Sequence, residues 1–219
     1  MKTKMFVLGA IAATTISCNT ETNNVNIPNP EVEQVQELVE EVAKAPLGRI
    51  NVDATQIGFG AFKTTEKVEV KGWFQSFVIE GVNQEAATWQ EAITGAWVTI
   101  DVPSIETNDV GRNKKVLEHF FGSTASNELI AAKVLSVDST LAVLEIDFNG
   151  LKKPVDFQVE LSNDTLNLTA TIDVADFDAT SAISAINKAC EALHKGADGV
   201  SKTWSEVNLY VSTVIRNKN

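Results

Sequence analysis

The amino-acid sequence predicts an all-β fold with a short helical insert, arranged as an antiparallel barrel of about eight strands. Three observations lead to this prediction. Apolar and polar residues alternate along several long runs between residues 49 and 216. Asn149-Gly150 separates two of these runs, which is a strong signal for a β-hairpin. The chain holds only 5 prolines, so few positions interrupt a strand.

Each alternating run places its apolar residues on one face of a strand and its polar residues on the other. The apolar members of these runs are Val98, Ile100 and Val102; Leu144, Ile146 and Phe148; Val155, Phe157 and Val159; Leu166, Leu168, Ala170, Ile172 and Val174; and Val207, Leu209, Val211 and Ile215. A sheet with one apolar face must cover that face. Long strands favour curling into a barrel, whose interior can hold one small ligand.

Two segments depart from the alternation. Residues 105–122 are polar and mixed, and Asn163-Asp164 marks a second, weaker hairpin turn. Residues 180–195 are predicted to be helical, because apolar residues recur there at steps of three and four, as an amphipathic helix requires. These residues are Ala182, Ile186, Ala189, Cys190 and Leu193.

The N-terminus has the form of an export signal. Lys2 and Lys4 precede an uncharged, mostly apolar run that is too short to span a bilayer, so residues 1–17 are predicted to be a signal peptide. The run ends at Ser17-Cys18, which is typical of a lipoprotein whose cysteine is acylated. We expect a periplasmic protein anchored through lipidated Cys18, in the outer membrane. The alternative is an ordinary signal peptide with an incidental cysteine.

Residues 18–48 are predicted to join the lipidated cysteine to a barrel domain of residues 49–219. The first part is polar and rich in asparagine, as in a flexible tether. Residues 30–44 then have the pattern of a short acidic helix, with Val32, Val35, Val39 and Val42 on one face. This helix is either a partner-binding helix or a spacer that frays, since isolated short helices are marginal.

The charge of the chain restricts its partners. The formal net charge is −11, which argues against nucleic acid as a partner, because nucleic-acid binding needs a basic face. It also disfavours electrostatic docking on anionic lipid. No motif for a cofactor is present, so none is expected. The sequence leaves the oligomeric state open, with a homodimer among the alternatives.

The segment CEALHKGADGVSKTW, residues 190–204, contains the clearest candidates for chemistry. Cys190 and His194 are four residues apart and would share one face of a helix, where they could bind a metal or form a thiol–base pair. A structural zinc needs four ligands, and the other histidine, His119, lies on a separate segment. Cys190 also belongs to the apolar stripe, where a buried thiol behaves as a small hydrophobe. Packing is therefore the favoured interpretation, with His194 bound to a backbone carbonyl and neither metal site nor catalytic residue expected.

A basic cluster is the second candidate site. Arg112, Lys114 and Lys115 lie close together in an acidic chain, and such a group can bind a phosphate-like head group. Lys195 and Lys202 could assist. The alternative is a solvated loop, which charge clusters usually are. Trp204 has the wrong parity for the inward face of the last strand, so it is expected at the entrance of that strand.

Several blocks of this sequence resemble the YceI-like family. They are KVEVKGWF, IDVPSIETNDVGRNKKVLEHFF, FNGLKKPVDF and LTATIDVADF, and the match extends over residues 49–216. Residues 190–204 are similar to a variant signature of the family, C-x-x-L-H-x-G-x-D-G-x-S-K-T-W. One departure is Asn113, which stands where the family usually has an acidic residue after the arginine.

The resemblance implies a lipocalin-like barrel, secreted to the periplasm, with a long apolar channel for a polyisoprenoid or another long-chain lipid. No catalytic activity is implied. The expected channel residues are Phe59, Phe62, Phe74, Ile100, Val102, Phe120, Phe121, Leu144, Ile146, Phe148, Phe157, Leu168 and Trp204. Phe59 and Phe62 can share a face only if Gly60 forms a bulge. The alternatives are a structural envelope lipoprotein with a filled barrel, and a thiol enzyme using Cys190 and His194.

Overall fold

The structure is a computed structural model that describes residues 47–217. The predicted signal peptide, Cys18, the tether and the helix of residues 30–44 lie outside the described residues. Within residues 47–217 the chain forms one ten-stranded antiparallel sheet with several short helices, which confirms the predicted fold class.

The order of the strands across the sheet is β3-β4-β6-β7-β8-β9-β10-β1-β2-β5. The strands span β1 Leu47–Lys63, β2 Val68–Phe74, β3 Phe77–Glu80, β4 Trp97–Asp101, β5 Ile105–Glu106, β6 Leu129–Val137, β7 Leu141–Phe148, β8 Leu151–Ser162, β9 Thr165–Asp173 and β10 Thr203–Asn217. The predicted number of eight is wrong, because ten strands are present. The alternating runs include none of β3, β5 and β6; β3 and β5, at the edges of the sheet, are too short to show such a pattern.

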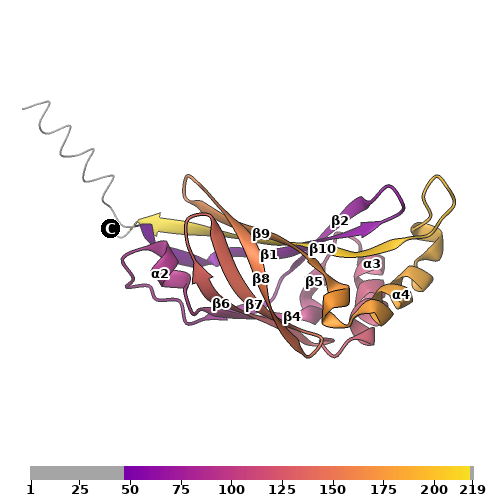
Figure 1. The fold of residues 1–219 in the computed structure, drawn as a ribbon, viewed down its shortest axis with the longest axis horizontal. Helices are drawn as coiled ribbons and strands as arrows, with labels where there is room; N and C mark the ends of the chain where they lie inside the picture. The colour runs from indigo at the N-terminus through magenta and orange to yellow at the C-terminus, as the bar shows by residue number, and fades with distance from the viewer. Residues whose placement is uncertain (1–46, 218–219) are drawn as a thin grey trace, which may run out of the picture. The chain divides into compact units, whose positions relative to one another are not determined.

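The sheet is curled into a half-barrel around its apolar face (Figure 1). No ladder joins the edge strands β3 and β5 within residues 47–217, so the barrel is not closed by hydrogen bonds there. The long strands β1 and β10 pair with each other from Leu47↔Asn217 to Lys63↔Thr203, and neither lies at an edge of the curled sheet.

Both predicted hairpin turns are confirmed. Asn149 and Gly150 join β7 to β8 with φ values of 52° and 77°. A positive φ at both central residues gives a turn whose twist matches that of the flanking strands, and asparagine and glycine tolerate it best. Asn163, with φ 55°, turns the chain from β8 into β9.

The predicted helix is present as α4, Thr180–Ala189, followed after Cys190 by the 3₁₀ turn η5, Glu191–Leu193. The mixed segment forms β5, then α3 (Val110–Lys115), the π-helical turn η2 (Val116–Phe120) and the 3₁₀ turn η3 (Phe121–Ser123). Two further 3₁₀ turns are η1, Val102–Ser104, and η4, Val174–Phe177. The helix α2, Trp89–Ile93, was not predicted.

The helices lie at opposite ends of the sheet, with α2 at one end and α3 and α4 at the other (Figure 1). Helix α2 packs against β1, and its Trp89, Ala92 and Ile93 are buried in the hydrophobic core together with Ile50 and Ile215. Burying each large apolar side chain contributes about 1.5–3 kcal/mol. The end of the interior under α2 is therefore filled core, and the opposite end is bounded by α3, η2 and α4.

Candidate apolar cavity

The interior near α3, η2 and α4 contains a cavity of about 460 Å³. Its wall comes from the strands β1, β2, β4, β6, β7, β8, β9 and β10, and residues of α3, η2 and α4 close it. The volume lies within the range of about 300–1,000 Å³ that small-molecule sites occupy. Most of the lining is aliphatic or aromatic carbon.

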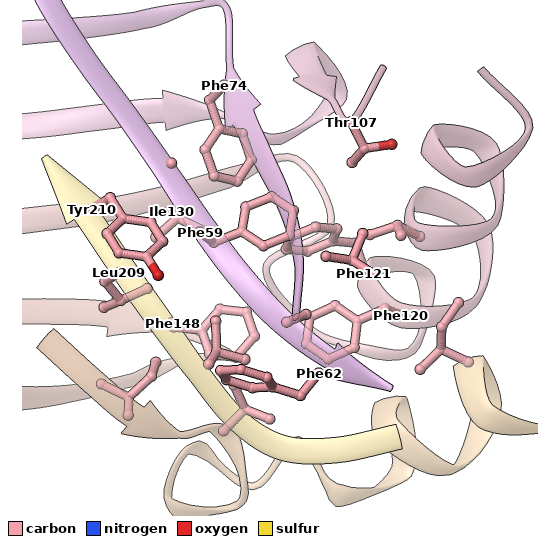
Figure 2. Close-up of a pocket in the computed structure, with 18 of the residues that line it drawn as sticks. Phe59, Phe62, Phe74, Thr107, Phe120, Phe121, Ile130, Phe148, Leu209 and Tyr210 are labelled. Atoms are coloured by element: carbon pink, nitrogen blue, oxygen red, sulfur yellow. The ribbon is translucent and has the colours of Figure 1, made fainter. Parts of the chain in front are cut away.

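Aromatic rings from both the strands and the helical segments surround this space (Figure 2). Phe59 of β1 and Phe74 of β2 have ring centroids 5.8 Å apart. Phe120 of η2 stacks on Phe148 of β7 at 6.2 Å and meets Phe121 edge-on at 5.1 Å. These contacts fix the rings relative to one another along the apolar wall of the cavity.

Eleven of the thirteen expected channel residues line the cavity. They are Phe59, Phe62, Phe74, Ile100, Phe120, Phe121, Leu144, Ile146, Phe148, Phe157 and Trp204. Val102 and Leu168 are buried but lie outside the lining. Val102 begins the turn η1 directly before Pro103, so it leaves the inward row of β4. Leu168 packs within the filled core.

The bulge expected at Gly60 is absent. Strand β1 pairs with β2 without interruption from Ile57 to Lys63, so Phe59 and Phe62 have opposite parity along the strand. The irregularity lies in β10, where Ala61 pairs with Val207 but Lys63 pairs with Thr203. Phe62 stands opposite this bulge and reaches the lining at the end of its strand.

The polar part of the lining centres on Thr107, which is buried between β5 and α3. Its backbone N–H and hydroxyl both donate to Asn113 Oδ1, at 2.9 and 2.6 Å. Arg112 donates from Nε to the Thr107 hydroxyl at 3.0 Å and from Nη2 to the Thr107 carbonyl at 2.8 Å. The side-chain oxygen of Asn113 thus accepts both hydrogen bonds from Thr107 and connects α3 to the residue that follows β5.

Of the expected head-group residues, only Arg112 lines the cavity, together with its neighbour Lys115. Lys114 is exposed and lies in a surface groove, since residues two apart on a helix do not share a face. Lys195 lies 3.6 Å from Glu191 in an ion pair, and Lys202 stacks on the Trp204 ring at 3.7 Å from its centroid. The expected head-group site is therefore not formed as a whole. Arg112 and Lys115 line the cavity, whereas Lys114, Lys195 and Lys202 do not.

Cys190 is 6% exposed, and both Cys190 and His194 line the cavity. His194 does not bind a backbone carbonyl as expected. Its Nδ1 lies 2.7 Å from the hydroxyl of Thr203, which itself donates to Asn187 Oδ1 at 3.0 Å. Burial and the positive charges of Lys63 and Lys115 lower the pKa of His194 below its ordinary value of 6.5.

The loop after His194 is fastened to the β1–β2 hairpin. Thr65 Oγ1 donates to Asp198 Oδ2 at 2.8 Å, and the N–H of Ala197 donates to Glu66 Oε1 at 3.0 Å. The indole Nε1 of Trp204 donates to the carbonyl of Thr64 at 2.8 Å. Much of the segment of residues 190–204 therefore has a structural role: it joins α4 to β10 and ties that connection to the adjacent hairpin.

No group of three or more His, Cys, Asp and Glu side chains in residues 47–217 lies close enough together to hold a metal ion. In the same part of the chain, no helix is both long enough and apolar enough to cross a membrane.

The site also contains residues that the sequence reasoning missed. Ile130 and Ala132 are aliphatic members of the lining, and Lys63 is a charged one. Val98, Val207 and Leu209 also belong to the lining; the alternating runs placed them on an apolar face, but the expected channel residues did not include them. Strand parity could have identified Lys63, because it follows Phe59 and Ala61 at steps of two along β1. The alternation after Ala61 was hidden by the adjacent Phe62.

The fold and the site together define an antiparallel β-protein whose sheet curls into a half-barrel around an apolar cavity. The model of the YceI-like domain matches residues 49–214, so the chain belongs to the YceI-like family. A comparison with curated proteins finds no match.

Two solved structures share the fold. One is a polyisoprenoid binding domain from Saccharophagus degradans implicated in plant cell wall breakdown, at 15% identity and a TM-score of 0.52, covering 76% of this chain and 97% of that one. The other is BcnA of Burkholderia cenocepacia, at 14% identity and a TM-score of 0.52, covering 77% of this chain and 100% of that one. At this identity the likeness concerns the fold alone.

Proposed function

We propose that this protein is a binding module that holds one long apolar chain, of polyisoprenoid or fatty-acyl type, inside its half-barrel. The observation that supports this function is the cavity of about 460 Å³ lined mainly by aromatic and aliphatic side chains. A cavity of this kind in the interior of a curled sheet suits a flexible hydrocarbon better than a polar metabolite, because few polar groups are present to bind one.

Membership of the YceI-like family and the fold shared with a polyisoprenoid binding domain are consistent with this ligand class. The energetics also favour it. Burying a chain of about fifteen methylenes contributes about 0.8 kcal/mol each, or about 12 kcal/mol before the cost of ordering the chain. Retention of such a ligand requires no chemical step.

Within this proposal the protein is not an enzyme. Cys190 is buried in an apolar wall, and the polar contacts of His194 connect it to Thr203 and Asn187. A purely structural role with a filled barrel does not fit a cavity of this volume. We further propose that the protein is exported and lipid-anchored through Cys18, which would place the binding module at a membrane surface; the leader sequence supports this part of the proposal.

The experiment is native mass spectrometry of the full chain after export with its own leader. We expect an adduct with the mass of a long-chain lipid, which solvent extraction identifies. Ala132→Phe, which places a ring in the cavity, should abolish the adduct. The matched control is Ala131→Phe, because Ala131 is the preceding residue of β6 and lies outside the lining. Absence of any lipid, or equal lipid content in both variants, would contradict the proposed function.

A further inference from the structure

The charged side chains that line the cavity come from two places. Lys63 ends β1, and Asp109, Arg112 and Lys115 belong to the start, middle and end of the α3 segment. Three cations and one carboxylate give this lining a local charge of +2, in a chain whose formal net charge is −11. The lining of the cavity is therefore locally positive, although the protein as a whole is acidic.

Two of these four groups already have partners. The guanidinium of Arg112 binds the hydroxyl and carbonyl of Thr107. The carboxylate of Asp109 accepts the N–H of Arg112 at 2.9 Å and caps α3. That hydrogen bond, together with the positive charges of Arg112 and Lys115, lowers the pKa of Asp109, so it is ionised and held in place. Arg112 and Asp109 therefore shape the wall.

Lys63 and Lys115 are different. Both are half-buried, and neither forms an ion pair with a carboxylate within residues 47–217. Lys63 shares the inward face of β1 with Phe59 and Ala61. A half-buried ammonium group without a counter-ion is costly, because it loses hydration without gaining an opposite charge.

Lys63, Lys115 and His194 all line the cavity. The charges of both lysines act on the His194 imidazole, which comes from the loop after α4. Glu191, three residues before His194, pairs with Lys195, and Asp109, whose carboxylate feels the charge of Lys115, caps α3. Within residues 47–217, two ammonium groups without an ion-pair partner therefore line a mainly apolar cavity, and the charges of both act on the same imidazole.

We propose that the bound chain carries an anionic head group, a carboxylate or a phosphate monoester, and that Lys63 of β1 and Lys115 of α3 bind it beside His194. This inference rests on the proposed function and specifies its ligand: an amphiphile with a negative end, not a neutral hydrocarbon. The apolar tail lies among Phe59, Phe120 and Phe148, and the head occupies the end where the lysines lack a counter-ion.

The test uses delipidated full-length protein and three chains of equal length: hexadecanoate, hexadecyl phosphate and neutral 1-hexadecanol. We expect Lys63→Met and Lys115→Met each to weaken the binding of an anionic chain about tenfold, because a hydrogen bond to a charged group is lost, and to leave 1-hexadecanol unaffected. Lys114→Met is the matched control, since Lys114 is the exposed neighbour of Lys115, and it should bind all three chains like the wild type.

The outcomes separate the two proposals. If only one of the two anionic chains depends on the lysines, the head group is assigned to that chemistry. If all three chains bind equally to every variant, the anionic head group is wrong and the apolar-chain function stands. If no chain binds the wild type, the proposed function fails and this inference fails with it.

A second measurement does not depend on the variants. A bound anion would offset the charges of Lys63 and Lys115, so the pKa of His194 should rise on binding, and the imidazole C–H resonances of the wild-type protein report that change. Asp109, Arg112, Tyr210, Glu191 and Lys195 are the other titratable or charged groups of the lining or of the adjoining segment. An unchanged titration of His194 on binding of hexadecanoate and hexadecyl phosphate would overturn the inference.

Discussion

The ring of Phe59 lies directly over the Cα of Gly72 on the neighbouring strand. A Cβ at Gly72 would stand 2.6 Å from Cζ of Phe59 and 2.9 Å from Cγ2 of Thr107. Real Cβ atoms essentially never come this close to their neighbours. Gly72 is therefore the position on β2 that allows an aromatic ring of β1 to lie flat against the wall of the cavity.

Gly72→Ala should destabilise the protein by about 1–3 kcal/mol, because the added methyl group overpacks the wall. It should also push the Phe59 ring into the cavity and weaken ligand binding. Urea unfolding measures the first effect, and lipid content after export measures the second. Gly122→Ala is the control, since its Cβ would meet its nearest neighbour at 3.4 Å, and it should leave both unchanged or slightly raise stability. If Gly72→Ala changed neither the free energy of unfolding nor the lipid content, the wall of the cavity would not be tightly packed at Gly72.

Trp204→Phe should lower the free energy of unfolding by about 1 kcal/mol, because the hydrogen bond from the indole to Thr64 is lost. The amide of Thr64, which donates to the carbonyl of Lys202 at 2.9 Å, should also exchange its hydrogen faster. Trp97→Phe, at a tryptophan that is 55% exposed, serves as the control and should change neither quantity. Equal exchange rates in the two variants would contradict an anchoring role for Trp204.

The pH dependence of stability should contain a contribution from His194. Its pKa is lowered in the folded protein, so the unfolded chain binds a proton more tightly. The free energy of unfolding therefore decreases as the pH falls below about 6.5, until the lower pKa of the folded state is passed. His194→Gln should flatten the profile between about pH 7.5 and about pH 5.5. An identical slope in the variant would show that His194 is not the group responsible.

Cys190 should resist alkylation in the folded protein, because its side chain is 6% exposed. A Cys18→Ser background leaves Cys190 as the single thiol of the chain. We expect modification only at the rate of global or local unfolding, and rapid modification in urea. If the native protein were labelled fast, and His194→Gln removed this fast labelling, the result would support the alternative hypothesis of a reactive pair formed by Cys190 and His194.

Cys18 should incorporate labelled palmitate in a bacterial host that processes lipoproteins, and Cys18→Ser should not. The variant should also move from the membrane fraction to the soluble fraction, since acyl chains supply the anchoring. Membrane association of both forms would contradict the predicted anchor.

The alternating pattern predicted the sheet well because long strands with one buried face carry a strong period of two. It gave no run for β6, whose sequence LIAAKVLSV does not alternate regularly, and it failed for β3 and β5, which are too short to show any period. Helix α2 was missed for a similar reason, although its start has a recognisable signal. Thr88 Oγ1 accepts the N–H of Glu91, and the Glu91 carboxylate reaches back to the N–H of Ala87, which is a variant of the capping box.

The candidate site was predicted unevenly. Bulky apolar residues on inward faces could be assigned, because strand parity decides which way they point. The charged residues could not be assigned from closeness in sequence. Lys114 and Lys115 are adjacent, yet the helical rotation between them places one outside and one in the cavity wall. Lys63 lies far from both in sequence, and only the folded sheet brings it to the same cavity.

The filling of one end of the half-barrel by Trp89 and its neighbours has a consequence for traffic of the cargo. Side chains occupy that end, so a hydrocarbon tail cannot extend past α2. A bound chain must therefore enter and leave elsewhere along the half-barrel, and its tail can be no longer than the space that remains, unless it folds back on itself.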